Sequence, residues 1–195
     1  VGIGGGSYGG YATLAGVAFT PTVYAAAVAY VAPSNLITLL DAIPPYWEAG
    51  RRQLYARMAD PTTPAGKALL VAESPLTRAR DIVTPLLVVQ GRNDPRVNIR
   101  ESDQIVAAVR DNGKPVEYLV APDEGHGFAR PINNLALVTA MEGFYAKYLG
   151  GRRQTDIPAD VAERLAAITV DPKVGVGVLV LGGLMLGVTG LLHAF

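Results

Sequence analysis

The residue pattern with the clearest chemistry lies at the start of the chain, where Gly5-Gly6-Ser7-Tyr8-Gly9 matches G-x-S-x-G. In this motif a tight strand-to-helix turn holds a serine side chain out at the edge of a sheet. The following helix points its N-terminus at the serine, and the backbone N–H of Tyr8 is placed to donate to a developing oxyanion. Taken alone, a glycine-rich turn with an incidental serine explains the motif equally well.

A serine nucleophile needs a base, and the sequence contains only two histidines, His126 and His193. His193 lies in an apolar stretch near the C-terminus, so elimination favours His126. His126 is flanked by glycines and follows a predicted strand, where an imidazole can reach a neighbouring loop. An ordinary surface histidine is the alternative interpretation.

The base in turn needs a carboxylate that fixes its tautomer and stabilises the imidazolium formed in the reaction. Asp94 follows the apolar run at residues 86–90 directly and lies between Ser7 and His126 in the sequence. An aspartate in an ordinary turn is the alternative. The order Ser, Asp, His, with each residue in a loop after a strand, is that of α/β-hydrolases. We therefore predict a catalytic triad of Ser7, Asp94 and His126 and no metal site or cofactor.

These loops require an alternation of strands and helices to position them. The hydrophobic pattern predicts strands at residues 1–5, 23–31, 86–90 and 116–120 and helices at 11–19, 46–60, 65–73, 101–111 and 134–149. Alternation of this kind indicates an α/β-hydrolase fold with a mostly parallel sheet flanked by helices. In such sheets, sites form in loops beyond the carboxyl ends of the strands.

Five longer motifs carry a resemblance to a known family: GGSYGGY, QGRNDPRV, ESDQIV, GKPVEYLV and DEGHGFARP, in that order along the chain. Together they resemble the prolyl oligopeptidase family of serine peptidases, in particular its acylaminoacyl-peptidase and dipeptidyl-aminopeptidase-like members. The resemblance runs from Val1 to about Pro172. It implies a peptidase that hydrolyses short peptides through an acyl-enzyme on Ser7.

The resemblance also implies parts that lie outside this chain. Family members carry an upstream β-propeller that restricts access to the site, the first strands of the hydrolase sheet, and an upstream tyrosine that joins the Tyr8 N–H in the oxyanion hole. We therefore expect an N-terminally truncated catalytic domain, with a peptide as its partner. The exposed sheet edge leads us to expect instability without the upstream half. Tyr46 and Trp47 could line a substrate pocket or simply pack between helices, and we expect a structural role for Arg96.

Composition adds few limits on function. Seventeen basic and seventeen acidic residues balance, so there is no global charge to attract nucleic acid, an anionic membrane or an acidic substrate. The absence of cysteine excludes disulfides and a thiol nucleophile but fits a reducing or an oxidising compartment. The compartment, cytoplasmic or periplasmic, therefore stays open. Without an initiator Met, the true N-terminus is expected to lie upstream.

The composition changes after Lys173. Residues 174–192 form an uncharged run of nineteen residues rich in Val, Leu and Gly, close to the ~20 needed to span a membrane. An appended membrane anchor, a foreign or misread stretch and a disordered tail all fit this run. We thus divide the chain into an incomplete catalytic domain (1–151), a C-terminal extension (152–173) and an apolar Gly-rich tail (174–195).

Two other functions remain compatible with the sequence. A carboxylesterase would use the same triad, because the acyl-enzyme chemistry does not depend on the leaving group. An inactive hydrolase fragment is also possible, because the oxyanion tyrosine and the first strands of the sheet are expected to lie upstream of this chain. The triad assignment is common to all three interpretations.

Overall fold

A twisted sheet at the centre of the molecule carries every predicted site loop. The computed structural model describes residues 1–43 and 45–171. Its five strands lie in the order β1 (Gly2–Gly6), β2 (Ala26–Tyr30), β3 (Leu86–Gly91), β4 (Val116–Ala121) and β5 (Thr169–Val170). The first four pair in parallel, and β5 pairs antiparallel with β4. The predicted mostly parallel α/β sheet is confirmed.

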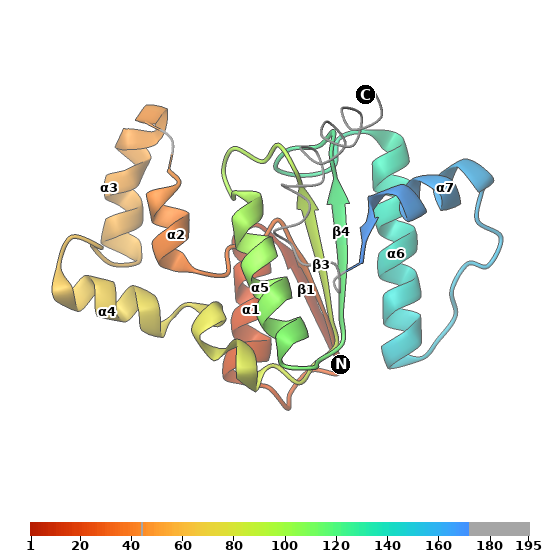
Figure 1. Ribbon diagram of the computed structural model, residues 1–195, viewed down its shortest axis with the longest axis horizontal. Coiled ribbons are helices and arrows are strands. Elements are labelled where there is room, and N and C mark those ends of the chain that lie inside the picture. Colours follow the sequence, from red (N-terminus) through yellow and green to blue (C-terminus); the bar gives the residue numbers. More distant parts are fainter. Residues whose placement is uncertain (44, 172–195) are drawn as a thin grey trace, which may run out of the picture.

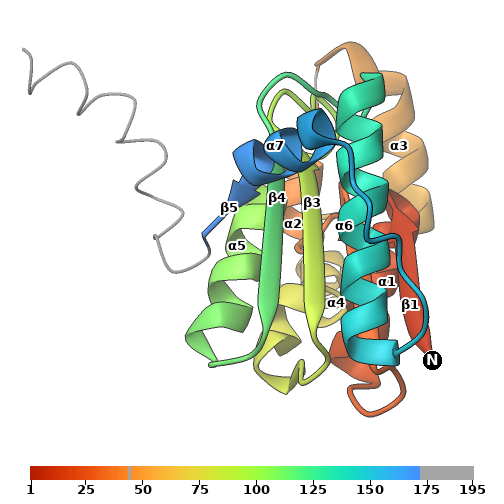
Figure 2. The same cartoon turned by 90° about the vertical axis from the view of Figure 1, so that its right-hand side faces the viewer.

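Helices cover both faces of this sheet (Figure 1, Figure 2). Helices α1 (Tyr8–Phe19) and α5 (Ile99–Asp111) lie on one face, and α6 (Pro131–Leu149) and α7 (Ala159–Ile168) lie on the other. Strand β3 is buried along its whole length, which explains why its residues 86–89 are all apolar instead of alternating with polar ones. The sheet thus separates two apolar cores and brings its loops to one end.

A helical excursion connects β2 to β3. It comprises α2 (Leu36–Asp41), a 3₁₀ turn (Pro45–Trp47), α3 (Glu48–Arg57), α4 (Pro64–Ala72) and a 3₁₀ segment (Pro75–Asp81). A small core of its own holds it together, formed by Leu36, Leu40, Ile43 and Leu70. In Figure 1 this excursion extends from the loop end of the sheet beside α1. It therefore borders the region where the predicted site residues meet.

Several predicted boundaries were wrong. The strand expected over residues 23–31 begins only at Ala26, because Val23 closes a turn by donating its N–H to the carbonyl of Thr20 at 3.1 Å. The helix expected over 46–60 starts as a 3₁₀ turn and ends at Arg57. Helix α1 starts at Tyr8, directly after the serine, three residues before the predicted start. An earlier start brings the helix N-terminus to the candidate nucleophile.

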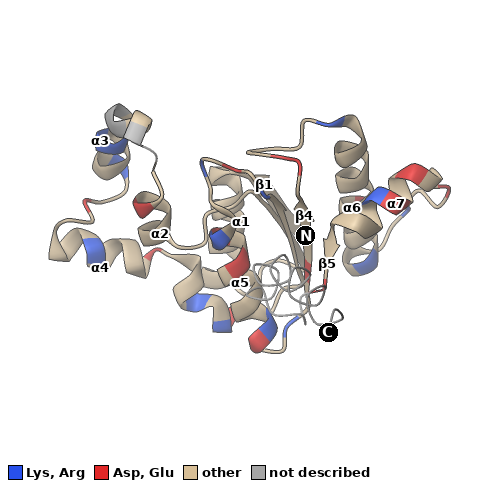
Figure 3. Ribbon diagram, turned by 45° about the horizontal axis from the view of Figure 1, so that its top comes forward, with Lys and Arg blue, Asp and Glu red and all other residues tan. Residues whose placement is uncertain are grey.

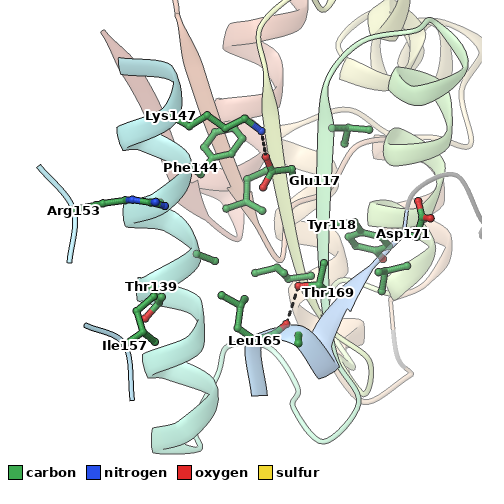
Figure 4. Close-up of a pocket in the computed structure, with 17 residues that line it drawn as sticks. Glu117, Tyr118, Thr139, Phe144, Lys147, Arg153, Ile157, Leu165, Thr169 and Asp171 are labelled. Carbon is green, nitrogen blue, oxygen red and sulfur yellow. Dashed lines mark hydrogen bonds and ion pairs between the residues drawn. The ribbon is translucent and has the colours of Figure 1, made fainter. Parts of the chain in front are cut away.

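The extension at residues 152–173 has more structure than the sequence indicated. Its α7 packs on α6, with Val161 and Ile168 buried in the same core, and β5 then pairs with β4. An open groove of about 840 Å³ lies between α6, β4 and the α7–β5 unit (Figure 4). The Lys147 ammonium and the Glu117 carboxylate form an ion pair of 2.9 Å on one side of it. The extension is therefore packed on the catalytic sheet.

Basic and acidic positions are interspersed on helices on both sides of the sheet (Figure 3). Within residues 1–43 and 45–171, no helix is both long and apolar enough to cross a membrane. The apolar run at residues 174–192 lies outside the described residues.

Candidate active site

The turn after β1 presents Ser7 in a strained backbone conformation. Ser7 has φ 56° and ψ −120°, a left-handed φ that is uncommon for a residue with a Cβ. Its N–H donates to the Tyr30 carbonyl at 2.9 Å, and its own carbonyl accepts from the Tyr11 N–H at 3.0 Å. A Cβ at Gly5 would lie 2.5 Å from the Gly9 carbonyl oxygen, so the turn tolerates only glycine there. This is the geometry of a nucleophile elbow.

The loop after β4 brings His126 to this serine. The Nε2 atom of His126 lies 2.9 Å from the Ser7 Oγ, across 119 positions of the sequence. The imidazole is largely buried, with 14% of the side chain exposed. A neutral imidazole at this distance can accept the hydroxyl proton of Ser7.

The loop after β3 supplies the carboxylate. The Oδ2 atom of Asp94 lies 2.7 Å from the Nδ1 atom of His126, and the Asp94 side chain is fully buried. Its other oxygen, Oδ1, accepts the backbone N–H groups of Arg96 and Val97 at 2.8 and 2.9 Å. Both oxygens are therefore occupied, and the carboxylate holds the imidazole with Nδ1 protonated and Nε2 facing Ser7. The structure thus brings the three predicted residues together in one hydrogen-bonded chain.

A buried glutamine, which the sequence analysis did not identify, supports Asp94. The Gln90 Nε2 lies 3.4 Å from Asp94 Oδ2 and 3.0 Å from the Val97 carbonyl. Its Oε1 accepts from the Ser102 hydroxyl at 2.8 Å, which fixes the orientation of the amide. Gln90 stands inside an apolar strand with no exposed surface, and a polar residue in that setting was the only sequence signal available.

The histidine loop is held by Glu124, a carboxylate buried to 4% exposure. It accepts the backbone N–H groups of Ala129 and Arg130 at 2.9 and 2.8 Å and the side-chain amide of Asn133 at 2.7 Å. Burial alone raises the pKa of Glu124, but these hydrogen bonds outweigh burial and hold the pKa below its ordinary value. Glu124 is therefore ionised at neutral pH and ties down both sides of His126.

Tyr30 connects the serine and histidine loops. Its carbonyl accepts the Ser7 N–H, and its hydroxyl accepts the backbone N–H of Phe128, two residues after His126. Its ring also meets that of Phe128 edge-on, with centroids 5.4 Å apart. Burial raises the pKa of Tyr30 to about 12, so the hydroxyl is neutral throughout the physiological range. Nothing in the sequence around Tyr30 indicated this role, because its partners are far away in the chain.

The N-terminus of α1 provides a place for negative charge. Tyr8 is the first residue of the helix, so its N–H is among the four that lack an acceptor within the helix. This N–H lies next to Ser7 in the chain, and the helix dipole adds a partial positive charge there. The arrangement can stabilise an oxyanion formed on a carbonyl that Ser7 attacks.

Tyr46 and Trp47, which were predicted to line a substrate pocket or to pack between helices, are not among the residues that line the cavity next to Tyr8. Tyr46 is 71% exposed, and Trp47 stacks against the Arg96 guanidinium at 5.6 Å from the ring centroid. A cavity of about 320 Å³ instead lies between α1 and the helical excursion. The residues that line it are Tyr8, Tyr11, Leu36, Arg57, Met58, Leu69, Leu70 and Glu73.

In the part of the chain that the structure describes, no group of three or more His, Asp or Glu side chains is placed to hold a metal ion. The chemistry that the geometry can perform is acyl transfer to a serine, with an imidazole moving the proton and a buried carboxylate orienting it.

Comparison with known proteins agrees with this geometry. Residues 1–152 match the model of the prolyl oligopeptidase family. The chain is 58% identical over 154 residues to dipeptidyl aminopeptidase BIII of Pseudoxanthomonas mexicana, and 46% identical over 155 residues to dipeptidyl peptidase family member 6 of Caenorhabditis elegans. Each alignment covers 79% of this chain but only 22% and 21% of the relative. The chain thus spans about a fifth of the length of these relatives.

Solved structures give the same result. A puromycin-hydrolysing peptidase of Mycobacterium tuberculosis superposes with a TM-score of 0.70 at 29% identity, over 78% of this chain and 22% of that one. An acylaminoacyl peptidase in complex with a chloromethyl ketone superposes with a TM-score of 0.69 over 84% of this chain and 26% of that one, and at 21% identity it supports the fold alone. The resemblance predicted from the five sequence motifs is confirmed, and the chain belongs to the prolyl oligopeptidase family of serine hydrolases.

Proposed function

We propose that this chain is the catalytic part of a serine peptidase that hydrolyses short peptides through an acyl-enzyme on Ser7. The observation that carries the proposal is the chain of contacts from Ser7 Oγ to His126 Nε2 at 2.9 Å and from His126 Nδ1 to Asp94 Oδ2 at 2.7 Å. Three residues from three separate loops meet with the tautomer already fixed for proton transfer.

The reaction follows from these contacts. As the Ser7 Oγ attacks the substrate carbonyl carbon, its proton passes to His126 Nε2, and the imidazolium is stabilised by Asp94. The carbonyl oxygen becomes an oxyanion that the Tyr8 N–H can bind. The Nε2 proton then goes to the leaving amine as the C–N bond breaks. Water attacks the acyl-enzyme with His126 again as base, and the acid product leaves as Ser7 recovers its proton.

The rest of the parent protein is also part of the proposal. The relatives are about five times longer than the matched region, and the family resemblance implies an upstream β-propeller and a second oxyanion donor. Loss of one oxyanion donor typically lowers kcat by about 10²- to 10³-fold. We therefore expect the 195-residue chain to acylate more slowly than the full-length protein does.

Within the family, the names of the two relatives reported above, a dipeptidyl aminopeptidase and a dipeptidyl peptidase family member, favour release of dipeptides. The cavity beside Tyr8 supports a site for one substrate side chain. At about 320 Å³ it is near the lower end of the ~300–1,000 Å³ range of ligand pockets, and Leu36 and Leu70 give it apolar walls. Arg57 and Glu73 also line it, so polar groups are available near its walls.

The direct test is covalent labelling of Ser7 by a fluorophosphonate probe. We expect labelling of the folded chain, none in Ser7→Ala, and labelling retained in Ser34→Ala, whose buried hydroxyl donates to the Glu101 backbone carbonyl at 2.6 Å. A folded chain that stays unlabelled would refute the proposal. Comparing the full-length protein on a dipeptidyl amide, its N-terminally blocked form and the matching ester then separates an aminopeptidase from the carboxylesterase that uses the same triad.

A further inference from the structure

Helix α7 lies outside the family match, which ends at residue 152, yet it packs in the same core as the sheet that carries the site. Its apolar side chains Val161 and Ile168 are buried against α6 and β4. Figure 2 shows α7 lying across the loop end of α6 and β4. One polar side chain of this helix, Arg164, reaches the histidine loop.

Arg164 contacts two residues at the base of that loop. Its Nε donates to the Asn133 Oδ1 at 2.5 Å, and its Nη2 forms an ion pair with the Asp123 carboxylate. The Arg164 side chain is 23% exposed, so the pair is partly shielded from water. Asp123 stands three residues before His126, and Asn133 opens α6 at the other end of the loop. Arg164 therefore links the two ends of the segment that carries the candidate base.

Asn133 relays this contact inward. It is completely buried, and its Nδ2 donates to the Glu124 carboxylate at 2.7 Å. A side-chain amide has one acceptor end and one donor end. Because Arg164 donates to the oxygen, the NH₂ end is left to face Glu124. The Nδ2 atom also contacts the Asp123 carboxylate at 3.3 Å, so loss of Arg164 leaves the NH₂ end with its acceptors but takes away the donor that holds the buried Oδ1.

Glu124 completes the connection, because its two oxygens hold the backbone of Ala129 and Arg130. Asn133 is its side-chain donor in this arrangement. An Asn133 Oδ1 left without a donor in this buried setting is costly, so the side chain would shift to find one and weaken its hydrogen bond to Glu124. The position of His126 depends on this segment, since Gly125 and Gly127 on either side of it supply no side-chain contacts of their own.

We propose that Arg164 is a positioning residue for His126, acting through Asn133 and Glu124, and that α7 is therefore part of the catalytic unit. The inference rests on the proposed function, because positioning matters only if His126 acts as the base. It assigns a role in the reaction to a helix beyond the matched family region.

The test measures inactivation of the full 195-residue chain by an alkyl fluorophosphonate, with kinact and KI determined separately. Arg164→Ala should lower kinact by about tenfold to about 150-fold, the range expected for one lost buried hydrogen bond to a charged group, and leave KI within about twofold. The kinact of Arg164→Lys should lie between those of the parent chain and Arg164→Ala, because lysine keeps the charge opposite Asp123 but lacks the forked guanidinium that also reaches Asn133.

Two control variants separate positioning from general packing. Arg153→Ala removes an exposed arginine of the same extension that lines the groove between α6, β4 and the α7–β5 unit (Figure 4), and should leave kinact unchanged. Val161→Ala loosens the packing of α7 without touching the polar relay, and should lower the unfolding temperature more than it lowers kinact. An equal loss of kinact in Val161→Ala and Arg164→Ala would overturn the proposal, as would an unchanged kinact in Arg164→Ala.

A second readout does not depend on activity. Amide hydrogen exchange at Ala129 and Arg130 should quicken by about tenfold in Arg164→Ala, because Glu124 no longer holds those N–H groups. If Arg164→Ala does not fold, Arg164→Gln supplies a neutral donor to Asn133 for both measurements. An unlabelled parent chain with the expected change in exchange would refute the proposed function and retain the relay; unchanged exchange would refute the relay itself.

Discussion

Removing the Tyr30 hydroxyl is the sharpest test of how the two catalytic loops are held together. Tyr30→Phe leaves the ring, its edge-on contact with Phe128 and its carbonyl bond to the Ser7 N–H in place. It deletes only the acceptor for the Phe128 N–H. The substitution therefore separates support of the histidine loop from support of the serine turn.

The expected loss of labelling rate in Tyr30→Phe follows from the Phe128 N–H, which is left without an acceptor. Phe128 is buried to 6% exposure, so its N–H has little access to water as a substitute acceptor. A buried donor without a partner costs about 1–3 kcal/mol. If that cost falls on the loop conformation that places His126 Nε2 at Ser7, the rate of Ser7 phosphonylation drops by between about fivefold and about a hundredfold.

The matched control is Tyr118→Phe. Its hydroxyl is also buried and donates to the Asp103 carboxylate at 2.7 Å, but on the α5 side of the sheet, away from the histidine loop. Tyr118→Phe should lower the unfolding temperature and leave the labelling rate near that of the parent chain. The reasoning is refuted if Tyr30→Phe labels at the parent rate, or if both variants lose labelling equally.

Three further outcomes are expected. Asp94→Asn should slow Ser7 labelling by roughly 10³-fold or more, because the amide can favour the wrong imidazole tautomer, whereas Asp103→Asn should not. In the folded protein the pKa of Glu124 is held below its ordinary value of 4.5, so the ionised carboxylate stabilises the fold above pH 4.5 and this stabilisation is lost as the pH falls through the lower folded pKa. The free energy of unfolding in urea, measured between about pH 5 and 3, should therefore depend less on pH in Glu124→Gln than in the parent chain. Gly5→Ala should abolish labelling because its Cβ would meet the Gly9 carbonyl at 2.5 Å, while Gly9→Ala, with nothing within 4 Å of its Cβ, should leave the unfolding temperature unchanged or higher.

The elements that sequence predicted well are those with a strong local signal. Strand β3 is a continuous apolar run closed by glycine, and α5 has apolar residues at helical spacing after the Asn98 cap. The G-x-S-x-G turn carries its glycines because the backbone there has no room for side chains. In each of these segments the residues that define the element are adjacent in the chain, and pattern alone was sufficient.

The parts that sequence missed depend on contacts between distant residues. Helix α2 is only six residues long, and its buried Leu36 and Leu40 gain their role from packing with α4. Tyr46 and Trp47 were candidates for a substrate pocket, but the cavity beside Tyr8 is lined by residues of α1, α2, α3 and α4. Which aromatic residues line a cavity is decided by how helices cross, and spacing along one helix carries no information on that.

The three predicted triad residues could be found from sequence motifs, but the residues that hold them in place could not. Ser7, Asp94 and His126 stand in loops with recognisable motifs, whereas Gln90, Tyr30 and Asn133 stand inside strands or at a helix start and look like ordinary element residues. All three are polar groups in buried surroundings, where an unpaired donor or acceptor is costly. Since such a group must form hydrogen bonds, a polar residue within an apolar strand indicates that a neighbouring polar group is its hydrogen-bond partner. In this chain the groups held are the Asp94 carboxylate and the two loops that carry Ser7 and His126.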